Sequence, residues 1–410
     1  MKRLILILTV TLGCWLPFFA QKPIKDLEPT VILISLDGFH PDYLDKYPSP
    51  TLNELAKEGT RAKWLIPSFP TKTFPNHYTV ATGLYPEHHG IVENNIYDFG
   101  TTFSLNKREE VQNSRWWLGE PIWATAVKQG QKAGAFFFPG TEAEIAGVRP
   151  TFWKEYDGKI PNQTRVAQIL SWIDLPTATR PTFYTLYFSD TDDAGHRFSP
   201  DSEEVKKAVA DVDADLKLLV DGLKARKIDK KVNLIIVSDH GMATVNQSNV
   251  VKLDDYFDFA NTERMLWTGE IVQIFPKNGK LEEIAAKLKT VSNAVCWKKT
   301  DVPARFHYNE GSRIAPIICS ADEGWILTSA ERFAESQKRE GFDRPRGAHG
   351  YDNQLASMRA LFIAHGKAFK KRKIVEPFEN VEIYNLMCRI LRLTPARNDG
   401  NFKHVKHLLR

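Results

Sequence analysis

The 410-residue sequence is poor in cysteine, and its excess of positive charge is small. Only Cys296, Cys319 and Cys388 follow the N-terminal segment, so at most one disulfide bridge can form among them. The formal net charge is +5, and the densest basic cluster, residues 370–373, is equally typical of a solvated helix end. We therefore expect neither a disulfide-rich scaffold nor binding of duplex nucleic acid.

Beyond its first 20 residues, the chain has no apolar stretch long enough to span a bilayer. The N-terminus begins with Met1, Lys2 and Arg3 and continues with an apolar run to Ala20, which is the layout of a secretory signal peptide over residues 1–20. Cys14 leaves lipidation open, and an uncleaved anchor is a third alternative. The sequence predicts export to the periplasm or the medium. Attachment to the cell envelope through the N-terminus is the alternative.

Short apolar runs recur along the chain, and their consecutive rather than alternating pattern predicts buried strands of a mostly parallel sheet. They cover residues 31–36, 134–138, 182–188, 232–237, 271–275 and 358–364. Apolar residues at helical spacing over 205–223 lead directly into the strand at 232, which indicates an α/β fold with helices on both faces of a central sheet. We expect one domain over residues 28–400, with a less regular candidate insertion at about 251–346.

Acidic and imidazole side chains follow these predicted strands where they end. Because the carboxyl ends of parallel strands meet at one edge of a sheet, we expect these side chains to share a crevice. Asp192 and His196 lie four apart around Gly195, which we interpret as a loop. Mixed oxygen and nitrogen ligands suit two zinc ions about 4 Å apart, with Mn or Fe as alternatives. The candidate ligands are Asp37, Asp192, His196, Asp239, His240 and His349.

The segment from Pro70 to His77 offers hydroxyl groups for a nucleophile. A hydroxyl held by a metal ion loses its proton near neutral pH, so Thr71 or Thr73 could attack an electrophile. A helix N-cap ahead of the apolar stretch after Asn76 is an equally good interpretation. The residues alone leave these three alternatives open.

Several motifs resemble, in the same order, those of the nucleotide pyrophosphatase/phosphodiesterase family in the alkaline phosphatase superfamily. The resemblance covers about residues 30–400 and is that of a catalytic core of the bacterial type. Its motifs are PTKTFPNHY at 70–78, TGLYPEHHGIV at 82–92, LDGF at 36–39, DDAGH at 192–196, SDHGM at 238–242, GAHG at 347–350 and ENVEIYNLMC at 379–388.

The resemblance implies an alkaline phosphatase-like fold and an exported zinc phosphodiesterase or nucleotide pyrophosphatase. Thr73 matches the nucleophile that forms a covalent phosphothreonine, and Asn94 matches the donor to a non-bridging phosphate oxygen. Two zinc ions are implied, one held by Asp192, His196 and His349 and the other by Asp37, Asp239, His240 and Thr73. The residues implied in substrate binding are Lys72, Phe74, Asn94, Tyr156 and Tyr187.

The segment around Thr73 has no arginine, which favours a phosphodiester or nucleotide substrate over a monoester. Asn95 and Leu118 stand where the family often has lysine, so a preference for triphosphates is not expected. A phosphomonoesterase, a phosphonate hydrolase and a choline-phosphate diesterase are the enzymatic alternatives. An inactive surface protein that binds nucleotides or glycans is the alternative from another class.

Overall fold

The structure is a computed structural model that describes residues 22–98 and 100–410. The signal peptide predicted over residues 1–20 lies outside the described residues. Within the described part of the chain, no helix is long and apolar enough to cross a membrane.

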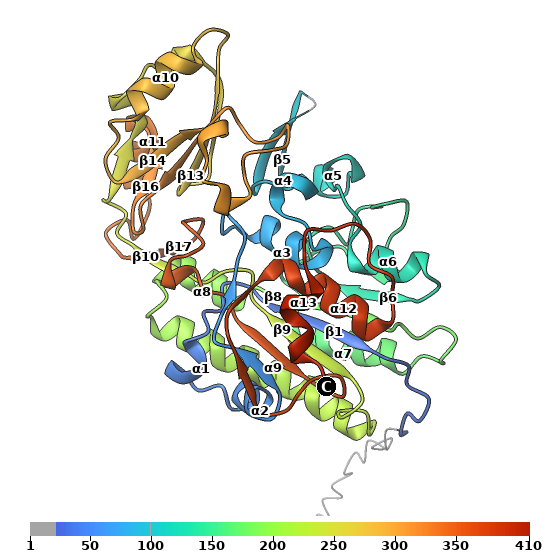
Figure 1. Cartoon of the computed structure of the whole chain (residues 1–410). Coiled ribbons are helices and arrows are strands. Elements are labelled where there is room, and N and C mark those ends of the chain that lie inside the picture. The colour runs from blue at the N-terminus through green and yellow to red at the C-terminus, as the bar shows by residue number, and fades with distance from the viewer. Residues whose placement is uncertain (1–21, 99) are drawn as a thin grey trace, which may run out of the picture.

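An eight-stranded sheet forms the centre of the molecule (Figure 1). Its strands, in spatial order, are β19 (Lys373–Val375), β2 (Thr60–Ala62), β18 (Phe362–His365), β9 (Asn233–Val237), β1 (Val31–Leu36), β8 (Phe183–Phe188), β6 (Ala133–Phe136) and β7 (Phe152–Trp153). The five strands from β9 to β7 run parallel, whereas β18 is antiparallel to both of its neighbours. The strand predicted at 358–364 corresponds to β18, which begins only at Phe362. It runs antiparallel to its neighbours, not parallel as expected. The α/β fold class is confirmed.

Helices cover both faces of this sheet. Successive side chains of β1 point to opposite faces, so they contribute to two different cores. Ile32 and Ile34 belong to the core beneath α2 (Pro50–Glu58), α7 (Asn162–Ile173) and α9 (Glu203–Ala225). Val31 and Leu33 belong to the core beneath the other layer. That layer contains α3 (Thr73–Thr82), α6 (Ile122–Lys128) and α12 (Ile383–Leu391).

A second sheet stands apart from the first, at the upper left of Figure 1. Its antiparallel strands are β12 (Thr262–Trp267), β13 (Ile271–Pro276), β15 (Ile317–Ala321) and β14 (Ala294–Lys298), with α10 (Leu281–Leu288) beside them. The expectation that 271–275 joins the parallel sheet is therefore wrong, because an apolar run does not specify its partner strand. This part of the region expected to be less regular has its own buried core and a Cys296–Cys319 disulfide.

Two short ladders connect the second sheet to the first. β10 (Ala243–Val245), which closely follows β9, pairs with β17 (Arg346–Ala348), and β11 (Val250–Lys252) pairs with β16 (Ile326–Thr328). The chain thus enters and leaves the second sheet beside the carboxyl end of β9. That edge of the main sheet carries the predicted ligands.

Candidate active site

The predicted strand ends do meet at one edge of the main sheet. Asp37 follows β1, and Asp239 and His240 follow the neighbouring β9 within three residues. Gly38 turns the chain with φ +65°, and a Cβ there would lie 3.1 Å from the Asp192 side chain. Glycine therefore allows the loop after β1 to approach the acidic residues closely.

Asp192 and His196 lie on the helix α8 (Asp190–Phe198). The expectation that they lie on a loop is therefore wrong. Residues four apart on a helix share one face, so both side chains still turn toward the same point. The loop was predicted because glycine disfavours helices. Here it lets α8 pack closely, because a Cβ at Gly195 would lie 3.0 Å from the methyl carbon of Met242.

Asp192, His196 and His349 form the first cluster of candidate ligands. The His196 Nε2 atom lies 3.4 Å from Asp192 Oδ1 and 3.1 Å from His349 Nε2. His349 Nε2 is 3.7 Å from the same Asp192 oxygen. The backbone orients both rings, since Nδ1 of His196 lies 3.0 Å from the Gly347 oxygen, and Nδ1 of His349 lies 2.8 Å from that of Thr71. Each Nε2 therefore faces the cluster.

Asp37, Asp239 and His240 form the second cluster. The His240 Nε2 atom lies 3.0 Å from Asp239 Oδ2 and 3.6 Å from Asp37 Oδ1. Thr73 Oγ1 is 3.3 Å from the same nitrogen. The rings of His240 and His349 stack with centroids 3.5 Å apart, so the two clusters are contiguous.

Three buried carboxylate oxygens in these clusters have no hydrogen-bond partner among the described residues: Asp37 Oδ1, Asp192 Oδ1 and Asp239 Oδ2. Each faces an imidazole Nε2 at 3.0–3.7 Å without forming a hydrogen bond. A buried ionised oxygen is costly unless it is paired or coordinates a metal. The donor set therefore fits metal cations. Two compact groups of three candidate ligands, whose ligand atoms lie within 4.8 Å of one another, support this, although they divide the residues differently: Asp192, His240 and His349 form one, and Asp37, His77 and Asp239 the other.

The electrostatics of the clusters lead to the same inference. Burial, together with the nearby Asp239 and Asp192 carboxylates, raises the pKa of Asp37 well above its ordinary value. Burial and the neighbouring His240 ring hold the pKa of His349 well below its ordinary value. A neutral imidazole and crowded carboxylates are the states that cations stabilise as ligands.

Thr73 and Thr71 have different surroundings. Thr73 is the first residue of α3, whose N-cap is Lys72, and it lines the cavity beside the clusters. The Thr71 hydroxyl is buried, donates to the Tyr351 carbonyl at 3.0 Å and accepts from the Gly350 N–H at 2.9 Å. The helix begins at Thr73 itself, so neither threonine is its N-cap.

His77 is a site residue that the sequence reasoning did not single out. It lies one turn after Thr73 on α3, and its Nδ1 is 3.3 Å from Asp239 Oδ2 and 2.8 Å from the Thr73 carbonyl. With Asp37 and Asp239 it forms one of the two compact ligand groups. Its spacing of four residues from Thr73 on a helix was the available signal.

A cavity of about 200 Å³ opens beside Thr73. Phe74, Tyr156 and Tyr187, the three aromatic residues expected in substrate binding, all line it. Arg108 and Glu142, which we did not predict, form an ion pair in its wall. They are separated by 34 residues, and no spacing in the sequence connects them.

Asn94 lies beside the segment around Thr73, whereas Lys72 does not line the cavity. The Asn94 side-chain oxygen accepts from the Phe74 N–H at 3.0 Å, which leaves its amide N–H groups available as donors. The Lys72 ammonium is buried, forms an ion pair with Glu270 and donates to the Thr268 carbonyl at 3.1 Å.

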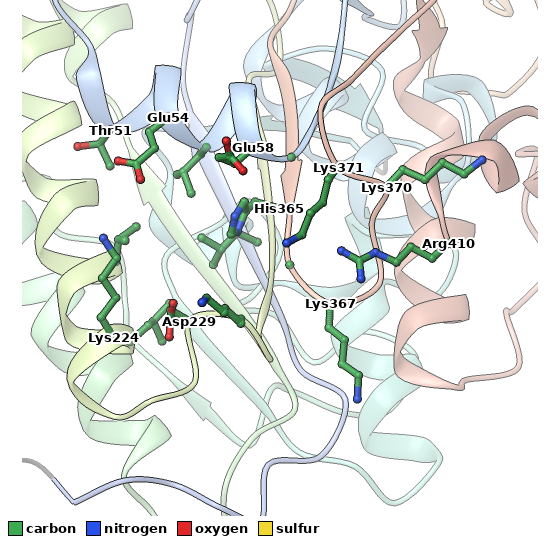
Figure 2. Close-up of a pocket in the computed structure, with 17 residues that line it drawn as sticks. Thr51, Glu54, Glu58, Lys224, Asp229, His365, Lys367, Lys370, Lys371 and Arg410 are labelled. Carbon is green, nitrogen blue, oxygen red and sulfur yellow. The ribbon is translucent and has the colours of Figure 1, made fainter.

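A second cavity, of about 360 Å³, lies at the opposite edge of the main sheet, near the start of β9 and the end of β18 (Figure 2). Its walls hold charges of both signs, since Lys371 and Arg410 lie across from Glu54 and Asp229. None of the predicted site residues lines it. The candidate active site is therefore the smaller cavity beside Thr73.

The sequence is similar to those of known proteins over nearly its whole length. A sequence profile of the family described as type I phosphodiesterase / nucleotide pyrophosphatase matches residues 31–352. Venom phosphodiesterase CdcPDE of Crotalus durissus collilineatus is 41% identical over 404 residues, which cover 95% of this chain and 47% of that protein. Ectonucleotide pyrophosphatase/phosphodiesterase family member 3 of Rattus norvegicus is 40% identical over 397 residues, which cover 93% and 44%. The chain spans about half the length of these curated relatives.

Solved structures are similar over nearly the whole described chain. Human ectonucleotide pyrophosphatase/phosphodiesterase 5 has a TM-score of 0.86 and 37% identity, covering 93% of this chain and 99% of that one. The murine protein, as an inactive threonine-to-alanine variant in complex with AMP, has a TM-score of 0.86 and 35% identity, covering 93% and 100%.

The α/β fold and the ligand groups at its strand ends define a metal-dependent protein of the alkaline phosphatase-like class. Within that class, the chain belongs to the type I phosphodiesterase / nucleotide pyrophosphatase family. The family predicted from the sequence is confirmed.

Proposed function

We propose that this chain is a zinc-dependent phosphodiesterase or nucleotide pyrophosphatase that uses Thr73 as its nucleophile. The observation that carries the proposal is the cluster of three buried carboxylate oxygens without hydrogen-bond partners among the described residues and several imidazoles, one of which lies 3.3 Å from the Thr73 hydroxyl. The relatives are named as phosphodiesterases, and one related structure is described as inactive when a threonine is replaced by alanine.

Asp192, His196 and His349 would hold one zinc ion, and Asp37, Asp239 and His240 the other. His77 is an additional candidate for the second group. When bound, the metal pair supplies positive charge that lowers the pKa of a hydroxyl group and offsets the charge of the phosphate. The nitrogen-rich donor set favours zinc over harder cations.

The reaction proceeds in two displacements at phosphorus. The Thr73 oxygen forms a bond to phosphorus, the bond to the leaving oxygen breaks, and a phosphothreonine ester results. Water then breaks that ester and restores the threonine hydroxyl. Thr73 is the first residue of a ten-residue helix, so the positive end of the helix dipole favours negative charge on its oxygen.

Asn94 would donate to a non-bridging oxygen of the substrate phosphate. Its side-chain oxygen is already bound by the Phe74 N–H, so its NH₂ group is the part left to face an anion. Donors placed where charge develops lower the barrier to reaction. Phe74 and Tyr156 line the same cavity and offer flat apolar surfaces to a nucleobase.

We further propose that the protein acts outside the cytoplasm on small phosphodiesters or nucleotides. The apolar N-terminal segment supports export, and the relatives include venom enzymes and ectoenzymes by name. The AMP complex of the murine relative supports a nucleotide substrate. Attachment to the membrane through the N-terminus is part of this proposal.

Thr73→Ala tests the proposed nucleophile, with Thr73→Ser as the variant that keeps the hydroxyl. We expect Thr73→Ala to abolish hydrolysis of bis-p-nitrophenyl phosphate while its zinc content stays at the wild-type value, and Thr73→Ser to retain measurable turnover. A near-normal rate for Thr73→Ala contradicts the proposed nucleophile. Faster hydrolysis of p-nitrophenyl phosphate than of the diester by the wild type contradicts the proposed substrate class.

A further inference from the structure

The turn between β12 and β13 reaches from the second sheet to the candidate active site. Trp267 and Val272 pair at the end of this hairpin, and Thr268 and Glu270 belong to the turn. The Thr268 N–H donates to the Ile271 carbonyl at 3.1 Å, which closes the turn. Besides backbone contacts within the second sheet and to Leu327, this turn makes two contacts that lead toward Thr73, one to Lys72 and one to Glu93.

One contact of the turn leads to the residue before Thr73. The Lys72 ammonium forms an ion pair with the Glu270 carboxylate and donates to the Thr268 carbonyl. Both side chains of the pair are buried, at 5% and 9% exposure, so solvent screens the pair weakly. Lys72 also packs against Gly350, where a Cβ would lie 2.4 Å from the lysine Cε.

The other contact leads to Asn94, the proposed donor to the substrate phosphate. The Thr268 hydroxyl lies 2.8 Å from Glu93 Oε1 and 3.1 Å from the Ile271 carbonyl, and its single proton goes to the nearer, carboxylate acceptor. The other oxygen of this buried carboxylate accepts from the N–H groups of Asn94 and Asn95. The Asn94 side chain then accepts from the Phe74 N–H. Hydrogen bonds therefore run from Lys72 through Thr268, Glu93 and Asn94 to Phe74, and the backbone between Lys72 and Phe74 closes this ring.

We propose that Thr268 is a positioning residue, which holds Asn94 in place relative to Thr73 through the Glu93 carboxylate. A single hydroxyl–carboxylate contact joins the turn to Glu93, while the Thr268 carbonyl holds the Lys72 side of the ring. Small displacements of a group that orients a phosphate are enough to slow a reaction. The second sheet thus contributes to the catalytic geometry although it supplies none of the predicted metal ligands.

Thr268→Val tests this inference, because valine keeps the shape and the backbone carbonyl but removes the hydroxyl. Thr268→Ser is the matched variant that keeps the donor. We expect Thr268→Val to lower kcat for a phosphodiester about tenfold, equivalent to about 1.4 kcal/mol in the barrier. KM, zinc content and the fraction of folded protein are expected to stay near the wild-type values. Thr268→Ser is expected to restore kcat.

A double-mutant cycle shows whether Thr268 acts through Asn94. We expect Thr268→Val to have little further effect on kcat in an Asn94→Ala background, because the group that it positions is already absent. Wild-type kcat in Thr268→Val, a loss that follows the lost folded fraction, or full additivity with Asn94→Ala would each overturn the inference. The inference rests on the proposed function, and a wild-type protein that binds zinc but cleaves no phosphodiester would refute that function instead.

Discussion

The Tyr187 hydroxyl offers a sharp test of the second ligand cluster. It donates to Asp37 Oδ2 at 2.6 Å, and both side chains are buried, at 8% and 1% exposure. The other oxygen of Asp37 is one of the three unpartnered oxygens that face the cluster. Tyr187→Phe removes only the hydroxyl, while the ring keeps its place against His77 and Tyr156.

The expected magnitude follows from the charge of the acceptor. A hydrogen bond to an ionised group contributes about 1.5–3 kcal/mol to stability. A metal ion on Asp37 requires the ionised carboxylate, so the lost bond weakens metal binding by the same amount. At about 1.4 kcal/mol per tenfold change, affinity should fall roughly 10- to 100-fold, a range typical for partners that orient metal ligands.

The assay is competition for zinc between the protein and a chromophoric chelator near neutral pH. Tyr184→Phe is the matched control, since Tyr184 lies on the same strand and its buried hydroxyl has no partner among the described residues. We expect zinc affinity to fall in Tyr187→Phe and to be unchanged in Tyr184→Phe. Equal affinities in both variants would refute the role of Asp37 as a ligand.

Two further predictions concern stability. Burial opposes the charged form of His240, but Asp239 outweighs it and raises the pKa of His240 above its ordinary value. From about pH 6.5 upward His240 itself then holds more of its proton in the metal-free folded state than in the unfolded state, so its own contribution to stability falls as pH rises. Thermal unfolding in a chelator should show this as a stability difference between wild type and His240→Gln that moves against the wild type as pH rises, and a difference that moves in its favour would contradict it. Asp213, on α9, accepts from the Thr51 and Leu52 N–H groups at 3.0 and 2.7 Å. Asp213→Ala should therefore lower the free energy of unfolding in denaturant by about 2–4 kcal/mol, whereas Asp211→Ala, exposed on the same helix, should change it by less than about 0.5 kcal/mol.

The sheet and its strand ends were predictable because burial acts on every residue of the central strands. β1, β8 and β9 are buried on both faces, so their apolar runs marked the strands to within a residue or two. Where such a run ends, the first polar residues face solvent or a ligand. Asp37 and Asp239 were identified by this reasoning, and their position at one edge required only that the strands be parallel.

The secondary structure around Asp192 was not predictable in the same way. Acidic residues and a glycine indicate a loop by local propensity, yet α8 forms there because three aspartates occupy its first turn and favour the positive end of the helix. The strands that pair with β13 could not be predicted from the sequence either. An apolar run records burial but not the strand that covers it, and the antiparallel neighbours of β13 arise from both sides of it in the chain.

Three consecutive residues show why the proposed nucleophile could not be chosen from side-chain chemistry alone. Thr71 and Thr73 carry the two hydroxyls that the sequence offers as candidate nucleophiles, and Lys72 between them carries an amine expected in substrate binding. Their partners lie far away in the chain: Thr71 meets Tyr351 at a separation of 280 residues, Lys72 meets Glu270 at 198, and Thr73 meets His240 at 167. The first two partners withdraw their groups from the cavity, whereas the third brings its group into the ligand cluster. The reactivity of this segment therefore depends on which residues the distant parts of the fold bring to it, and the second sheet takes part in that selection through Glu270.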